Sequence, residues 1–172
     1  MILERSNCFV PLATKAQDLF DYLTFLIKEP LPWQKHFGFD AVEINNSWID
    51  KEPALHQVHQ HLPIQRLGLL RVLPFSFYDW HVDQHRLSCI NMLINVSHHS
   101  HCLFAEQLDP HTKDVCELRY SPRTYYLFNN QVTHAVLNAG GPRYMFSLYF
   151  ETETKYEDAK DCLKDLLITD EF

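Results

Sequence analysis

The chain has none of the cysteine spacings that mark a zinc knuckle or a disulfide scaffold. Its five cysteines form an odd, irregular set without a CxxC pair, whereas such scaffolds use even numbers at regular spacings. They are Cys8, Cys89, Cys102, Cys116 and Cys162. The N-terminus also lacks a basic region followed by a long apolar run, so no signal peptide is indicated. We therefore expect a reducing, cytoplasmic location.

Long hydrophobic runs and basic stripes are absent as well. No stretch approaches the roughly 20 apolar residues that span a bilayer, so no membrane partner is expected. The chain carries a net charge of -7 and has a pI near 5.8. An acidic surface repels phosphate backbones, and we therefore expect no nucleic-acid partner.

The chain does contain enough apolar material for one compact domain. Hydrophobic residues make up 46% of the sequence and aromatic residues 13%, which predicts a folded core. We expect a single domain over residues 1–172, with a helical N-terminal support over 1–62, a jelly-roll core over 63–151 and a C-terminal helix over 152–172. The sequence leaves the oligomeric state open.

Helical patterns lie at both ends of the chain. Apolar residues recur at helical spacing over residues 14–28, and a proline at a first helical position predicts a short helix over 53–61. Between them, residues 33–48 mix aromatics with turn residues and have room for one or two short strands. Residues 156–168 predict a closing helix.

Between residue 63 and the closing helix, the pattern is that of short strands separated by turn signals. The candidates are 64–73, 77–83, 87–96, 102–108, 125–128, 132–138 and 143–151. Short strands at regular spacing predict a sandwich or barrel. We predict a mainly β, α+β fold: a double-stranded β-helix, which is a cupin-like jelly roll, braced by the N-terminal and C-terminal helices.

The tripeptide His81-Val82-Asp83 offers two metal ligands one residue apart. On a strand, these two side chains point to the same face. His134, from a distant strand candidate, completes a 2-His-1-carboxylate triad, which holds non-heme Fe(II) with positions left open. The sequence therefore predicts an oxygen-activating iron site at His81, Asp83 and His134.

Arg143 follows His134 by nine residues and is suited to bind a carboxylate through two parallel hydrogen bonds. A Gly-Gly turn predicts a hairpin over residues 132–150 in which His134 lies opposite Ser147. Arg143 then lies about 13 Å from that partner, at about 3.3 Å per residue. An extended arginine and a five-carbon dicarboxylate together cover much of this distance, which favours 2-oxoglutarate as co-substrate.

The segments around these residues resemble a known family. Residues 80–83 and 127–143 resemble the HxD…H…R core of the Fe(II)/2-oxoglutarate-dependent dioxygenases, in particular the small prolyl-hydroxylase-like and aspartyl/asparaginyl-hydroxylase-like members. The resemblance spans about residues 68 to 150. It implies iron ligands at His81, Asp83 and His134, and a contact between Arg143 and the co-substrate carboxylate.

The resemblance also implies a reaction. Dioxygen and 2-oxoglutarate would be consumed, a C–H bond hydroxylated, and succinate and CO2 released. Asp83 favours hydroxylation, because halogenating relatives carry a small residue at that position. One branch of the family has a hydroxyl two residues after the arginine, where this chain has Met145. The candidates for that supplementary contact are Asn91, Tyr126 and Ser147. The substrate is expected to be a small molecule, an amino acid or a peptide side chain.

Two other functions stay open. One is a cupin enzyme with another metal or co-substrate, although such sites tend to have three or four histidines and no matching arginine. The other is a non-catalytic jelly-roll module that binds a metal or ligand. Among the remaining histidines, His98, His99 and His101 predict a polar surface loop. His85 and Arg86 predict either a solvated turn or part of the substrate mouth.

Overall fold

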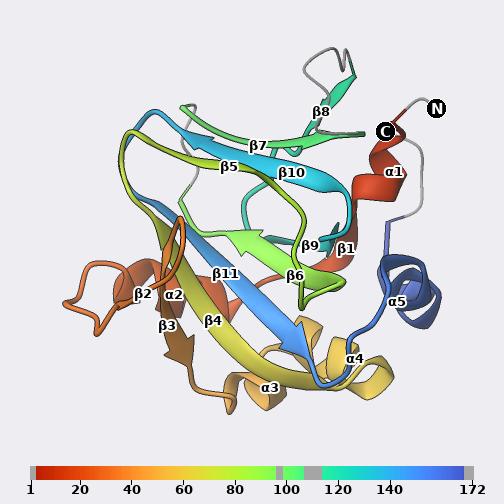
Figure 1. Ribbon diagram of the computed structural model, residues 1–172. Coiled ribbons are helices and arrows are strands. Elements are labelled where there is room, and N and C mark those ends of the chain that lie inside the picture. Colours follow the sequence, from red (N-terminus) through yellow and green to blue (C-terminus); the bar gives the residue numbers. More distant parts are fainter. Residues whose placement is uncertain (1–2, 96–98, 107–113, 169–172) are drawn as a thin grey trace.

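In the computed structural model, residues 3–95, 99–106 and 114–168 are described, and they form two facing antiparallel sheets with helices outside (Figure 1). The larger, seven-stranded sheet contains, in spatial order, β1 (Phe9–Lys15), β9 (Thr124–Asn129), β6 (Ser88–Leu93), β11 (Arg143–Phe150), β4 (Ile64–Val72), β3 (Asp40–Ile44) and β2 (Gln34–Lys35). The smaller, four-stranded sheet contains β5 (Ser76–His81), β10 (Thr133–Asn138), β7 (Ser100–Ala105) and β8 (Val115–Glu117). The helices are α1 (Arg5–Cys8), α2 (Asp18–Leu26), α3 (Trp48–Lys51), α4 (Pro53–His61) and α5 (Tyr156–Cys162), followed by the 3-10 turn η1 (Lys164–Leu166).

The order in which the chain visits the two sheets is that of a double-stranded β-helix. From β4 to β11 successive strands alternate between the larger and the smaller sheet, except that β7 and β8 follow one another in the smaller sheet. Every strand pair is antiparallel. The predicted jelly-roll fold, mainly β and braced by helices, is therefore confirmed.

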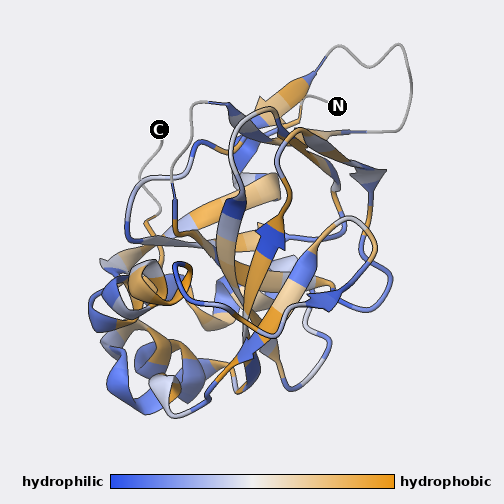
Figure 2. Ribbon diagram, turned by 90° about the vertical axis from the view of Figure 1, so that its left-hand side faces the viewer, coloured by the Kyte–Doolittle hydropathy of each residue, from blue (hydrophilic) through white to orange (hydrophobic). Residues whose placement is uncertain are grey.

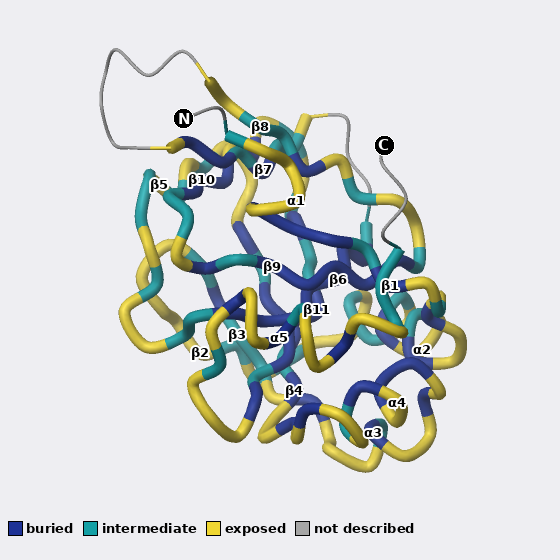
Figure 3. The backbone as a smooth tube through the Cα atoms, turned by 90° about the vertical axis from the view of Figure 1, so that its right-hand side faces the viewer, coloured by how far each residue is buried: buried dark blue, intermediate teal, exposed yellow. Residues whose placement is uncertain are grey.

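The larger sheet is covered on both faces. On one face, Leu23 of α2 and Leu55 of α4 belong to the same buried cluster as Leu69 of β4. On the other face, Phe128 of β9 packs with Phe104 of the smaller sheet. In Figure 2, many of the strands accordingly contain orange, hydrophobic segments. In Figure 3, the central strands β6 and β9 are mostly dark blue because they are buried. Alternate residues of each central strand therefore face either the helices or the space between the sheets.

The N-terminal 62 residues contribute strands as well as helices. Strand β1, which the sequence analysis did not predict, pairs with β9 at the edge of the larger sheet. Pro11 lies within it, and an edge strand tolerates a proline because one side needs no ladder hydrogen bond. Among the described residues, no helix combines the length and apolar character needed to cross a membrane.

The predicted hairpin over residues 132–150 is wrong. Its two strands lie in different sheets: β10 pairs with β5 and β7, whereas β11 pairs with β4 and β6. The connection crosses between the sheets and is fixed by Asn138, whose Nδ2 donates to the carbonyls of Leu73 and Gly141 at 2.9 Å each. Because the two sheets face each other, His134 and Arg143 still point into the same space.

Glu52 fixes the start of α2, which begins at Asp18 and not at residue 14 as predicted. Its carboxylate accepts hydrogen bonds from the backbone N–H groups of Gln17 and Leu19, both at 3.0 Å. The Glu52 side chain is fully buried. A carboxylate at a helix N-terminus satisfies N–H groups that have no partner within the helix and is favoured by the helix dipole.

We expect Glu52→Ala to lower the free energy of unfolding by about 3 kcal/mol, because hydrogen bonds to a charged group contribute about 1.5–3 kcal/mol each. Urea denaturation followed by circular dichroism measures the change. Glu29 is exposed and lies just beyond the end of α2, so Glu29→Ala serves as the control and should stay within about 0.5 kcal/mol of the wild type. Equal effects of the two substitutions would show that Glu52 does not anchor the helix.

Candidate metal centre

The structure brings the three predicted metal ligands together. His81 is the last residue of β5, Asp83 lies two residues beyond it, and His134 lies opposite His81 on β10. Their ligand atoms all lie within 4.8 Å of one another. The two imidazole rings have centroids 4.3 Å apart, and Nε2 of His81 is 3.6 Å from Oδ1 of Asp83. Two nitrogens and one carboxylate oxygen therefore converge on one point.

Backbone carbonyls orient both imidazoles. Nδ1 of His81 donates to the carbonyl of Asp79 at 2.6 Å, and Nδ1 of His134 donates to the carbonyl of Val132 at 2.9 Å. With Nδ1 occupied, Nε2 of each ring is left as the metal-binding atom, the arrangement usual for metal-bound histidines. Burial, followed by the neighbouring His81, lowers the pKa of His134 to about 4, so His134 is neutral at pH 7 and able to bind a metal.

The second oxygen of Asp83 is saturated by protein donors. Oδ2 accepts hydrogen bonds from Nε of Arg86 at 2.9 Å and from Nδ2 of Asn130 at 2.7 Å, and it forms an ion pair with Nη2 of Arg86 at 2.8 Å. Only Oδ1 faces the two histidines. Sequence reasoning did not place Arg86 at the ligand and missed Asn130 altogether. The available signal was an arginine three residues after the aspartate, which is a common ion-pair spacing.

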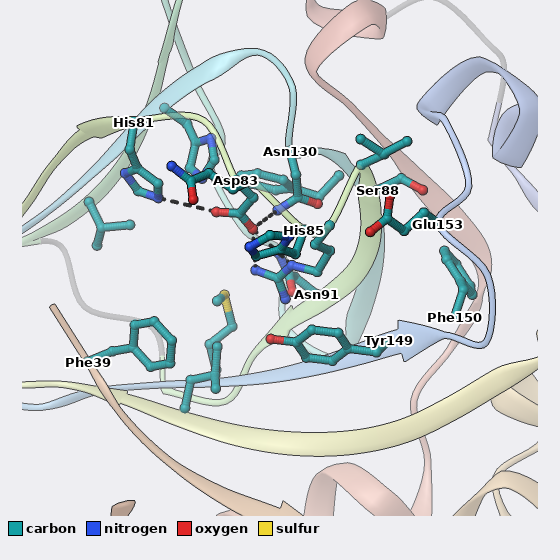
Figure 4. Close-up of a pocket in the computed structure, with 18 of the residues that line it drawn as sticks. Phe39, His81, Asp83, His85, Ser88, Asn91, Asn130, Tyr149, Phe150 and Glu153 are labelled. Carbon is teal, nitrogen blue, oxygen red and sulfur yellow. Dashed lines mark hydrogen bonds and ion pairs between the residues drawn. The ribbon is translucent and has the colours of Figure 1, made fainter. Parts of the chain in front are cut away.

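A cavity of about 500 Å³ lies between the sheets and contains the triad. In Figure 4, His81, Asp83 and Asn130 lie on one side of it, and Phe39 and Tyr149 on the other. Ligand-binding cavities of proteins commonly occupy about 300–1,000 Å³. The space is therefore large enough for a small co-substrate and the reacting part of a second molecule.

Arg143 lines the same cavity and is only 2% exposed. Its Nη1 lies 3.9 Å from Sδ of Met145, its Cζ lies 5.5 Å from the ring centre of Tyr120, and its Nε has no hydrogen-bond partner. Within residues 3–95, 99–106 and 114–168, no carboxylate forms an ion pair with it. A buried cation without an anion is costly, so the arrangement fits an anionic ligand.

The other predicted co-substrate contacts differ in their surroundings, and Asn91 lines the cavity whereas Ser147 and Tyr126 are not among its lining residues. Asn91 lines the cavity, is 2% exposed, and has no partner for Oδ1. Ser147 lies opposite Asn91 on β11, is fully buried, and accepts a hydrogen bond from Nη1 of Arg86 at 3.0 Å. The hydroxyl of Tyr126 accepts from the N–H of Ser121. Their roles toward a co-substrate stay predictions.

Among the residues that the structure describes, the remaining histidines do not form a second centre. His101 pairs with Glu117 at 2.6 Å, His99 is exposed, and His98 lies outside the described residues. His85 lies beside the cavity and is labelled in Figure 4. In the described part of the chain, His81, Asp83 and His134 form the one group of three side chains with metal-binding spacing.

No protein-family model and no curated protein sequence matches the chain. Solved structures do match. A prolyl-4-hydroxylase from Pseudomonas putida is 17% identical, with 83% of this chain and 91% of that one covered and a TM-score of 0.58. A Trichoplax adhaerens prolyl hydroxylase, solved with a hypoxia inducible factor oxygen degradation domain peptide fragment, is 12% identical, with 91% and 87% covered and a TM-score of 0.59.

A third match is a 2OG-Fe(II) oxygenase family oxidoreductase from Burkholderia pseudomallei, which is 11% identical, with 80% of each chain covered and a TM-score of 0.52. The chain therefore shares the fold of the 2-oxoglutarate- and Fe(II)-dependent oxygenases. At these identities the likeness establishes the fold.

Proposed function

We propose that the chain is an Fe(II)- and 2-oxoglutarate-dependent oxygenase that hydroxylates a C–H bond of a small molecule, an amino acid or a peptide side chain, with release of succinate and CO2. One observation carries this proposal: a 2-His-1-carboxylate triad and a buried arginine, with no counter-ion among the described residues, line the same cavity. The first suits a non-heme iron with open positions. The second suits a ligand with a carboxylate.

Each side chain then has a defined task. His81, Asp83 and His134 would hold the iron through Nε2, Oδ1 and Nε2. Arg143 would bind the distal carboxylate of 2-oxoglutarate, and its guanidinium would gain an anion that no carboxylate of the described residues supplies. Bound iron supplies oxygen activation, and the walls of the cavity exclude water around the reacting atoms.

Two observations support small molecules, amino acids and peptide side chains as the substrate class. The Trichoplax prolyl hydroxylase was solved with a peptide fragment, which favours including peptides among the candidates for this chain. The cavity holds both apolar and polar side chains at its wall, including Phe39, Tyr78 and Gln65, which fits a mixed substrate such as an amino acid or a peptide side chain.

The test is formation of succinate from 2-oxoglutarate, read by NMR, with a panel of free amino acids and peptides as candidate substrates. We expect succinate only when ferrous iron, 2-oxoglutarate and dioxygen are all present, and more of it with a true substrate. Calorimetry of the Mn(II)-loaded protein with 2-oxoglutarate gives a second readout. Metal binding without 2-oxoglutarate binding would overturn the proposal and favour another cupin enzyme or a non-catalytic module.

A further inference from the structure

Asp83 lies outside regular structure, so its orientation depends on other groups. β5 ends at His81. Two hydrogen bonds hold the backbone at Asp83: its N–H donates to the carbonyl of Asn130 at 3.1 Å, and the carbonyl of Asp83 accepts from Nε2 of Gln131 at 2.9 Å. These bonds position the backbone. They leave the rotation of the carboxylate to the donors that meet Oδ2.

Arg86 is the main donor, and it is itself immobilised. Nε and Nη2 bind Oδ2 of Asp83, and Nη1 donates to the hydroxyl of Ser147 at 3.0 Å. Its Cζ lies 4.7 Å from the ring centre of Tyr149. Since Ser147 and Tyr149 belong to β11, Arg86 connects the ligand loop after β5 to the larger sheet. A guanidinium held on every nitrogen is a rigid support.

We propose that Arg86 is a positioning residue: with Asn130, it turns Oδ2 of Asp83 away from the metal, so that Asp83 gives one oxygen and a coordination position stays open for 2-oxoglutarate. This inference rests on the proposed function. It adds that the second oxygen must be restrained, because a carboxylate can bind a metal through one oxygen or both. A facial triad offers three open positions, two for 2-oxoglutarate and one for dioxygen, and a second Asp83 oxygen would take one of them.

The decisive measurement is the affinity for 2-oxoglutarate when the protein is saturated with Mn(II), by calorimetry. Saturation removes any effect of the substitution on metal binding itself. We expect Arg86→Met to weaken 2-oxoglutarate binding at least about tenfold, in the range typical of changes to groups that orient metal ligands. Arg86→Lys keeps the positive charge beside Asp83 but offers a single nitrogen, so it should show a smaller loss. The lysine variant also carries the test if the methionine variant does not fold.

Arg66 provides the matched control. Its Cζ lies 4.3 Å from the ring centre of the same Tyr149, but no hydrogen bond or ion pair joins it to Asp83 among the contacts of the described residues. Arg66 also lines the cavity, as Arg86 does, so Arg66→Met removes a cavity-wall cation and a Tyr149 contact without touching Asp83, and it should cost much less 2-oxoglutarate affinity than Arg86→Met. A comparable loss in both variants would mean that the stack on Tyr149 or the positive charge at the cavity wall, and not the contact with Asp83, is responsible, and would overturn the inference.

Crystals of the Mn(II)-loaded proteins give a readout that does not depend on affinity. In the wild type, Asp83 should contact the metal through Oδ1 alone, and in Arg86→Met through both oxygens. One-oxygen binding in the variant, or wild-type 2-oxoglutarate affinity in it, would overturn the inference while leaving the proposed function intact. If the wild type itself binds no Mn(II) or no 2-oxoglutarate, the proposed function fails and the inference fails with it.

Discussion

Replacement of Asp83 by alanine is expected to reduce succinate formation at least about a hundredfold, because even the outer groups that orient a metal ligand typically contribute 10–100-fold. Asp83 supplies the one anionic ligand of the triad, and its Oδ1 faces the histidine pair. Loss of that oxygen leaves two imidazole ligands, which bind ferrous iron weakly. Succinate formation under saturating iron and 2-oxoglutarate, read by NMR, measures the effect.

Two further variants separate ligation from folding. Asp83→Asn keeps the shape of the side chain and an oxygen for Arg86, so it should fold as the wild type does and still lose most activity. Asp79 lies on β5, four residues before Asp83, and is exposed; its backbone carbonyl, which the substitution keeps, accepts a hydrogen bond from Nδ1 of His81. Asp79→Asn should therefore retain activity. Wild-type turnover in the Asp83→Ala protein would show that the ligand set is wrong.

The ligands could be predicted because their chemistry constrains the local sequence. Two ligands on one face of an extended segment are separated by one residue, and His81 and Asp83 have this spacing, although β5 ends at His81 and Asp83 lies beyond the predicted strand. Arg143 was predicted because few side chains bind a carboxylate with two nitrogens. The strand pattern then gave the fold class, since short strands with turns between them leave few alternatives to a sandwich or barrel.

The features that could not be predicted depend on contacts between distant segments. A Gly-Gly turn after β10 predicts a tight hairpin, yet the chain crosses to the other sheet, and the side chain of Asn138 holds this crossing through the carbonyls of Leu73 and Gly141. Asn130 reads as a turn residue, and only the folded chain shows its amide on Asp83. Such side-chain bonds across the fold leave no periodic signal in the sequence.

Arg143→Met should raise the stability of the free protein while removing most of its response to 2-oxoglutarate. The guanidinium is buried without a carboxylate partner among the described residues, and replacing buried charges by apolar side chains is often stabilising by about 1–4 kcal/mol. Methionine is flexible and fits beside Met145 and Tyr120, which already contact the arginine. The same substitution should weaken 2-oxoglutarate binding by about 2–5 kcal/mol, the usual loss when one partner of a buried charged pair is removed.

Thermal unfolding of the Mn(II)-loaded proteins with and without 2-oxoglutarate tests both effects together. The wild type should gain about 2.7 kcal/mol when the ligand is at 100 times its dissociation constant, and Arg143→Met should gain less than about 1 kcal/mol at the same ligand concentration. Arg71 is the matched control, because it is already paired with Asp40 at 2.6 Å: Arg71→Met should lower stability and keep the ligand response. A destabilised Arg143→Met protein that still responds would mean that the chain itself neutralises Arg143, and that the co-substrate carboxylate binds elsewhere.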